Sequence, residues 1–395
     1  MEKKLSIDMH YLKMILSKLL NIPSPTGYTD KVVHFICNEL EKLGISYELT
    51  RRGAIRADIK GNKSSPDRAI VAHLDTLGAM VTKIKSNGRL SLTSIGTWSS
   101  RFAEGARVSI FTDTGARRGT IIPLKASGHA YDTEIDTQPV SWDNVELRVD
   151  EDSLCEDDLI ELGFNVGDWV AVDSPLEISP GGYINARHLD NKAGVAVLMA
   201  AAHAVIETGV KLPIDCHLLF TISEEVGSGA SAVLHGDVAE MVSIDNAPLI
   251  KGKNRFEKGV TLCIKDSSGP FDYHLTHLLI ELCQRHKILH QRDVFRYYKC
   301  DAASAIEAGN DLRTALACFG VDASHGHERS HLGSLESLAH LMSVYMQSPP
   351  VTDRDRKYLG PINGFTEQPL ASADEPENQS CYIGSENEAD NIKKE

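Results

Sequence analysis

Residues 68–75, Arg-Ala-Ile-Val-Ala-His-Leu-Asp, are a short apolar run that closes on polar side chains. Such a run is typical of a buried parallel strand that carries side chains to a site at its carboxyl end. Two later runs have the same character: 217–222 is followed directly by Ser-Glu-Glu, and 241–245 ends in an aspartate. The three runs together predict an α/β sheet with polar side chains gathered at its strand ends.

Helical periodicity surrounds these runs. Apolar residues recur at helical spacing near the N-terminus, and an Ala-rich segment closed by Gly209 has the composition of a core helix. We expect helices at 12–20, 30–43, 193–207, 274–286 and 334–345, and a further strand at 313–319.

The sequence pattern changes between residues 84 and 177. Short β-type runs at 108–112, 119–122, 145–149 and 169–172 alternate with Gly, Asp and Ser turns. The pattern predicts a small all-β module inserted into an α/β domain. The expected domains are therefore a discontinuous catalytic α/β domain (1–83 and 178–349), a β-rich dimerisation insert (84–177) and a disordered acidic tail (350–395).

Composition excludes several functional classes. A formal net charge of −14 argues against a nucleic-acid partner or an anionic membrane. No run of about 18 apolar residues is present, and Lys13 and Lys18 interrupt the apolar N-terminal segment, so neither a transmembrane helix nor a signal peptide is expected. Eight cysteines without CxxC spacing indicate reduced thiols rather than disulfides or a zinc-thiolate site. We expect a cytoplasmic protein.

The polar strand ends offer metal-site chemistry. His73 and Asp75 are two residues apart, so on an extended segment they project to one side, where His73 can ligate a metal and Asp75 can orient it. A surface histidine beside a turn aspartate is the simpler alternative. Asp190 precedes the Ala-rich helix and can either cap it or bridge two cations.

Glu224 and Glu225 are the most informative pair. Two adjacent carboxylates at the mouth of an apolar strand are costly unless cations or protons compensate them. One glutamate as metal ligand and the other as general base explains the pair, although a solvated pair on a loop is also common.

A competing motif lies near the end of the α/β region. Residues 327–331, His-Glu-Arg-Ser-His, fit HExxH, the signature of single-zinc peptidases, which requires a helix through both histidines. Gly326 and Gly333 bracket the motif, which favours a loop before the helix. A single histidine from this segment can still complete a site formed by the other clusters.

The order of these motifs resembles metallopeptidase family 42, the TET, glutamyl and deblocking aminopeptidases. The resemblance covers roughly residues 9–345 and rests on HLD at 73–75, LDNKAG at 189–194, EEVG at 224–227, SID at 243–245 and the late histidine. It implies a zinc-peptidase α/β/α sandwich with an inserted PDZ-like β-barrel used in dimer contacts. It also implies a homo-oligomer, either a dimer or a dodecamer, and a peptide or small amide substrate.

The resemblance further implies a site with two divalent cations per subunit, zinc in the first place and cobalt or manganese as alternatives. The metal ligands would be His73, Asp190, Glu225, Asp245 and His331, with Asp190 bridging both ions and with His327 and His325 left open as the last imidazole. Glu224 would be the catalytic base and Asp75 would orient His73. Asp301 and Ala302 would line the substrate cleft.

Some positions depart from the family pattern, and two other functions stay open. Thr76 stands where many members have glutamate, and the late histidine lies in a different context, so substrate preference does not transfer. The segment 325–338 resembles a bacterial subgroup linked to operons for an acetylated dipeptide-amide osmolyte. A di-metal amidohydrolase acting on a small acylated amino acid or dipeptide is one alternative, and a non-catalytic scaffold is the other.

Overall fold

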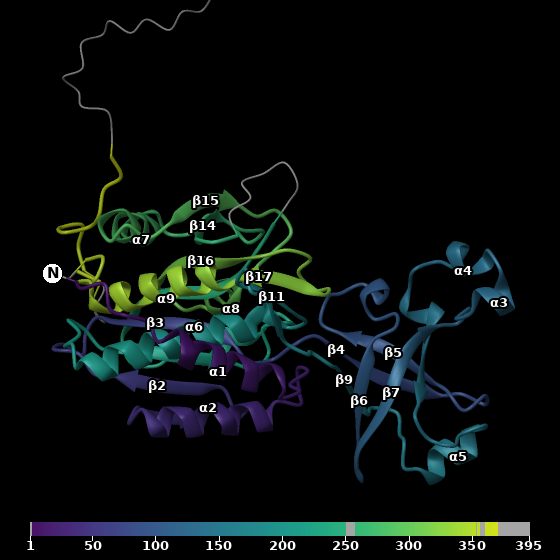
Figure 1. Ribbon diagram of the computed structural model, residues 1–395. Coiled ribbons are helices and arrows are strands. Elements are labelled where there is room, and N and C mark those ends of the chain that lie inside the picture. The colour runs from purple at the N-terminus through teal and green to yellow at the C-terminus, as the bar shows by residue number, and fades with distance from the viewer. Residues whose placement is uncertain (1, 250–256, 353, 356–359, 370–395) are drawn as a thin grey trace, which may run out of the picture.

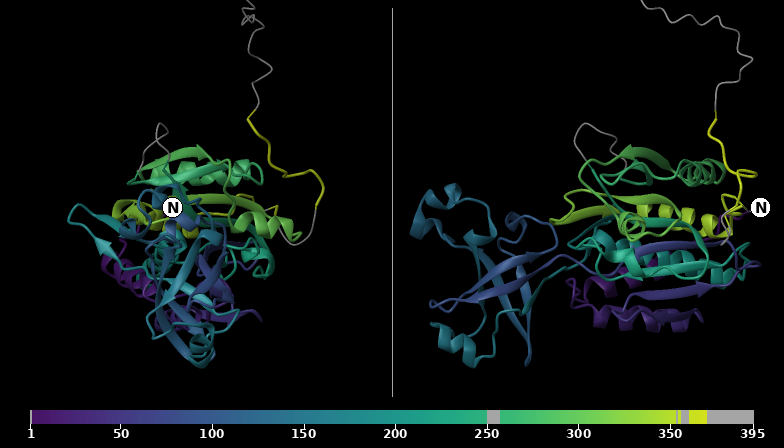
Figure 2. Two further views of the ribbon diagram at one scale, coloured as in Figure 1. Left: turned by 90° about the vertical axis from the view of Figure 1, so that its right-hand side faces the viewer. Right: turned by 180° about the vertical axis from the view of Figure 1, so that it is seen from behind.

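The computed structural model describes residues 2–249, 257–352, 354–355 and 360–369. An α/β domain carries a β-barrel beside it (Figure 1). The barrel projects from the end of the α/β domain at which β11 (Tyr183–Ala186) and β17 (Glu328–His331) lie, as Figure 2 shows from behind.

The α/β domain is built on a mixed sheet. Its eight strands lie in the order β1 (Ser46–Leu49), β2 (Ile55–Ile59), β12 (Cys216–Thr221), β3 (Asp67–His73), β13 (Val238–Pro248), β16 (Arg313–Val321), β14 (Val260–Lys265) and β15 (His290–Val294). The four central strands, β12, β3, β13 and β16, run parallel, while β2 and β14 join them antiparallel. Parallel central strands bring their carboxyl ends to one edge of the sheet, where ligand sites of such sheets form.

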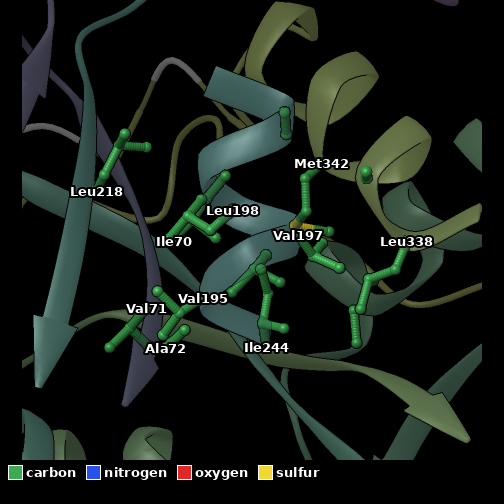
Figure 3. Close-up of a cluster of buried hydrophobic side chains, with 14 of the residues drawn as sticks. Ile70, Val71, Ala72, Val195, Val197, Leu198, Leu218, Ile244, Leu338 and Met342 are labelled. Carbon is green, nitrogen blue, oxygen red and sulfur yellow. The ribbon is translucent and has the colours of Figure 1, made fainter. Parts of the chain in front are cut away.

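Helix α6 (Leu189–Thr208) lies on β3 and β13 and also contacts α1 (Met9–Leu20) and α9 (Leu332–Gln347). Figure 3 shows this core, in which Val195 and Val197 of α6 approach Val71 and Leu338. By length and composition α6 could cross a membrane, but 89% of its most apolar 18-residue stretch is buried in the domain. Its uniform apolarity therefore reflects packing on both sides within the core.

The remaining helices of the α/β domain cover the flanks of the sheet. Helix α2 (Asp30–Lys42) packs against β1 and β2, and α7 (Tyr273–Arg285) packs against β14 and β16. Helix α8 (Asp301–Glu307) packs against η3 (Gly229–Ala232) near the central strands.

The barrel is closed by six strands. They follow the order β4 (Gly78–Ile84), β5 (Leu90–Ile95), β8 (Val145–Val149), β7 (Gly115–Pro123), β6 (Arg107–Thr112) and β9 (Trp169–Val172), around a hydrophobic core of their own. Their connections carry η1 (Ser100–Phe102), α3 (Gly128–Tyr131), α4 (Glu134–Thr137), η2 (Trp142–Asn144) and α5 (Glu156–Glu161). A separate three-stranded sheet of β10 (Glu177–Ile178), β11 and β17 adjoins the α/β domain.

The fold agrees with the expected elements and differs at several boundaries. The barrel begins at Gly78 rather than at residue 84. The apolar run that contains His73 continues beyond Asp75 without a turn, so the sequence does not mark where the α/β domain ends and the barrel begins. At Gly78 a Cβ atom would lie 2.6 Å from Pro25 Cβ and 2.9 Å from the Val170 carbonyl oxygen, so glycine permits a close approach there. Within the large sheet, strands β1, β2, β14 and β15 were not expected, and neither was helix α8.

The cysteines agree with a reduced interior. The described cysteines are all free thiols, and six of the seven are buried. The eighth, Cys381, and most of the expected acidic tail lie outside the described residues.

Candidate metal centre

Strand register explains why residues far apart in sequence meet at one edge of the sheet. Thr221 of β12 pairs with His73 of β3, and Ser243 of β13 pairs with Val71. Continuing the second register by two residues places Asp245 level with His73. Asp245 was expected at the end of its strand, but β13 runs on to Pro248 because Asp245–Pro248 still pair with β16.

His73, Asp190 and Asp245 form the first candidate metal group. One donor atom of each lies within 4.8 Å of the others, and all three side chains are buried. His73 Nδ1 lies 2.9 Å from the backbone carbonyl oxygen of Asp75, which makes Nδ1–H the donor. Nε2 then faces Asp190 Oδ1 at 3.1 Å, and is the nitrogen that could bind a metal.

Asp190, Glu225 and His325 form the second candidate group, so Asp190 belongs to both. His325 donates from Nδ1 to the Thr97 carbonyl oxygen at 2.8 Å, which leaves Nε2 facing Asp190 Oδ2 at 3.3 Å and Glu225 Oε2 at 3.7 Å. Glu225 Oε1 is buried without a hydrogen-bond partner in the described part of the chain. One imidazole and two carboxylates in each group are donors that suit zinc.

The backbone at the start of α6 sets the position of Asp190. Asp190 and Asn191 have non-helical backbone angles although they lie within the bounds of α6. The carboxylate therefore points away from the helix axis, where Oδ2 also accepts a hydrogen bond from Asn246 Nδ2 at 2.6 Å. The sequence left two roles open for Asp190. These contacts favour a carboxylate that bridges two groups, rather than one that caps the helix.

His331 does not lie in either group, so the structure corrects its expected place. Its Nε2 donates to the Gly181 carbonyl oxygen at 3.0 Å, and its Nδ1 accepts from the Gly333 N–H at 2.9 Å at the start of α9. Both ring nitrogens are thus engaged away from the centre. His327 is exposed, and His325 is the late histidine that reaches the other ligands.

The HExxH geometry is absent from this segment. Residues 328–331 form strand β17, so His327 and His331 are not one helical turn apart. Glu328, which would have been the base in that arrangement, instead accepts the N–H of His325 through Oε1 and the N–H of Asp190 through Oε2, both at 3.1 Å. Its buried carboxylate ties the late loop to the bridging residue, a contribution that sequence reasoning missed.

Asp75 contacts His73 as expected and has a further role. Its backbone carbonyl lies 2.9 Å and its Oδ1 3.6 Å from His73 Nδ1, while its carboxylate also accepts the N–H groups of Glu224 at 3.1 Å and Glu225 at 3.3 Å and the Thr26 hydroxyl at 2.7 Å. Asp75 therefore positions the backbone of the glutamate pair. Glu224 belongs to neither metal group, and its Oε2 lies 3.7 Å from His73 Nε2.

Negative charge accumulates in the centre. Burial, followed by the neighbouring Asp190, raises the pKa of Asp245 to about 8, and burial raises the pKa of Glu224 and of Glu225 well above their ordinary value. Burial alone would lower the pKa of His73, but the surrounding carboxylates raise it well above its usual range. A buried excess of carboxylates is the situation that bound dications relieve.

Asp301 lies in a helix and not in a loop. It begins helix α8, is buried, and accepts the Thr221 hydroxyl at 2.8 Å. Ala302 beside it is buried as well. The signal that could have found His325 was present in the sequence: like the other clusters, it follows an apolar strand end, here Val321 of β16.

Known proteins provide an independent comparison. The family model described as M42 glutamyl aminopeptidase matches residues 53–341. YhfE of Bacillus subtilis (strain 168) is 37% identical over 338 residues, which cover 85% of this chain and 97% of that protein. The two share most of their length, so the similarity is not confined to one domain.

Solved structures match the fold at lower identity. A TET aminopeptidase from the archaeon Thaumarchaeota archaeon SCGC AB-539-E09 superimposes with a TM-score of 0.79 at 21% identity, covering 86% of this chain and 96% of that one. The TET1 peptidase of Pyrococcus horikoshii, which can assemble into a tetrahedron or a large octahedral shell, gives 0.75 at 21% identity, with 85% and 98% covered. Together with the family match and the shared length, they identify the chain as a member of the M42 glutamyl aminopeptidase family of peptide-hydrolysing enzymes.

Proposed function

We propose that this chain is a di-metal aminopeptidase that removes N-terminal residues from peptides. One cation would be held by His73, Asp190 and Asp245, and the other by Asp190, Glu225 and His325. The observation that carries the proposal is the position of Asp190, whose two carboxylate oxygens face imidazoles of different groups at 3.1 and 3.3 Å. A carboxylate shared in this way suits two cations close together.

The donor set fits divalent metals. Each group combines one imidazole with two carboxylates, which suits zinc, and cobalt or manganese could also be accommodated. When bound, such cations lower the pKa of a water towards about 7 and polarise the scissile carbonyl.

Glu224 is the proposed general base. Its carboxylate reaches the centre without belonging to either metal group, and Asp75 holds its backbone. Glu224 would accept the proton of the attacking water and pass it to the leaving amine.

A free substrate N-terminus suits a centre of this kind. The lone pair of a neutral α-amine could bind one of the two cations, whereas the nitrogen of an acetylated amine, whose lone pair is delocalised into the carbonyl, could not. The proposal therefore favours an exopeptidase over a deacylase.

The barrel is the proposed dimerisation surface of a homo-oligomer. It projects from the α/β domain (Figure 2) and exposes apolar side chains, including Leu154, Ile160 and Val166. Exposed apolar side chains on a projecting domain suit contact with a second subunit. The tetrahedral and octahedral assemblies of the Pyrococcus horikoshii TET1 peptidase support a homo-oligomer here as well.

A substrate panel tests the proposed function. Purified protein would be assayed after chelation and after reloading with Zn²⁺, Co²⁺ or Mn²⁺, with free-amine aminoacyl amides and their N-acetylated counterparts. We expect hydrolysis of the free-amine amides only in the reloaded protein. Preference for acetylated substrates would move the assignment to a deacylase, and no hydrolysis by metal-replete protein would favour the scaffold alternative.

A further inference from the structure

A second cluster of histidine and aspartate lies at the opposite edge of the sheet. Asp67 begins β3 and His217 is the second residue of β12, whereas His73 ends β3 and Glu224 follows β12. The seven residues of β3 separate the two edges by about 20 Å. Whatever this cluster does, it does not contact the candidate metal centre.

Three of its side chains converge on one point. Asp58 of β2 and His217 are direct partners in the antiparallel pair, and His235 reaches them from the connection between η3 and β13. Asp58 Oδ1 lies 2.7 Å from His217 Nδ1 and 3.1 Å from His235 Nε2. One donor atom of each residue lies within 4.8 Å of the others. Two imidazoles and a carboxylate are ligands that zinc prefers.

A fourth residue, Asp67, contacts the ring of His217 on the side away from Asp58. The other ring nitrogen of His217, Nε2, lies 3.3 Å from Asp67 Oδ2, an ion-pair distance. Asp67 in turn accepts the Asp237 N–H at 2.9 Å. A carboxylate behind the distal nitrogen of a histidine is the arrangement that orients metal-binding imidazoles.

The cluster is enclosed and incompletely paired. The side chains of His217 and Asp67 are only 3% and 5% exposed, yet His217 Nε2 and Asp67 Oδ1 have no hydrogen-bond partner among the described residues. A Cβ atom on Gly236, at φ +67°, would lie 2.7 Å from Asp67 Oδ2, so glycine lets the backbone close over the cluster. Asp58 and His235 are partly exposed, which leaves an entry path.

We propose that Asp58, His217 and His235 form an additional divalent-metal site of the zinc class, with Asp67 as the carboxylate that orients His217. A cation about 2 Å from each donor requires only small side-chain shifts from the observed distances. Bound there, it would fix the connection that leads from Glu224 and Glu225 back to β13, because His235 lies on that connection.

A lysine lies beside the cluster. Lys60 faces Asp58 Oδ2 at 3.5 Å and Asp215 at 3.0 Å, so its charge is shared between the two carboxylates.

Metal stoichiometry tests the proposal. Full-length protein, stripped by chelation and reloaded with Zn²⁺ at pH 8, would be analysed for zinc per chain alongside His235→Ala and Asp58→Asn. The controls are Lys60→Ala, beside the cluster, and His340→Ala, another partly buried histidine facing a glutamate at 4.0 Å. We expect both cluster variants to hold one zinc fewer than wild type and controls.

Equal zinc content in wild type, the two cluster variants and the two controls would overturn the proposal. The cluster would then be an ion-pair network without a metal. Because the comparison is a difference between proteins, it does not depend on how many cations the candidate metal centre holds. Anomalous diffraction at the zinc edge from wild-type crystals gives the same answer without any variant. A peak among the three donors supports the site, and peaks at the candidate metal centre alone refute it.

Discussion

Nε2 of His325 lies 3.3 Å from Oδ2 of Asp190, across 135 residues of sequence. Two features hold this contact. Reciprocal backbone hydrogen bonds between Asp322 and Arg329 close a loop that carries His325 at its tip, and Glu328 binds the N–H groups of both partners. The candidate metal centre is thus completed by the loop before β17 and not by the start of α9.

Glu224→Gln is expected to keep metal content and fold while activity falls at least ~10²-fold, because the amide preserves shape but cannot accept a proton. The measurement is turnover of an aminoacyl amide by protein whose metal content equals that of wild type. Glu336→Gln, which changes a half-exposed glutamate of α9 in the same way, serves as a control and should keep its activity. Near-normal turnover by Glu224→Gln would remove it as the base.

Asp190→Asn is expected to lower occupancy in both metal groups, because a neutral amide cannot offset two dications. Elemental analysis after dialysis measures the loss. Asp322→Asn, a carboxylate half-exposed on the adjacent loop, should retain full occupancy. Retention of two metals by the Asp190 variant would contradict the bridging role.

His325→Ala is expected to reduce metal content and activity, whereas His331→Ala is expected to reduce stability. The first should lose one metal per chain and most activity, because its imidazole faces Asp190 and Glu225. The second should keep its metals but lose about 0.5–2 kcal/mol of stability, because His331 caps α9 through the Gly333 N–H. Metal analysis and thermal unfolding separate the two effects, and metal loss from His331→Ala would reverse the assignment.

Glu240→Ala is expected to destabilise the α/β domain by about 3–5 kcal/mol, because it leaves the guanidinium of Arg68 buried without its carboxylate at 2.8 Å. Both side chains are essentially inaccessible. Denaturant unfolding measures the loss. Replacing both partners with apolar residues, Arg68→Met with Glu240→Leu, should recover part of it. A double variant less stable than the single one would show that the pair stabilises beyond its desolvation cost.

Much of the fold and of the candidate site was determined by the sequence alone. Apolar runs closing on His73 and preceding Glu224 are strands because a buried parallel strand has no polar face, and the structure confirms both as β3 and β12. Their parallel arrangement brings the strand ends together, and the resemblance of the motifs to metallopeptidase family 42 named His73, Asp190, Glu225 and Asp245 as one ligand set.

Tertiary structure alone decided the rest. The choice of His325 over His331 depends on the loop closed by Asp322 and Arg329, and the role of the Asp75 carboxylate depends on which backbone N–H groups pack against it. The cluster of Asp58, His217 and His235 depends on the antiparallel register of β2 and β12. Local periodicity encodes which face of an element is apolar, but register, loop direction and backbone contacts are set only when distant segments pack.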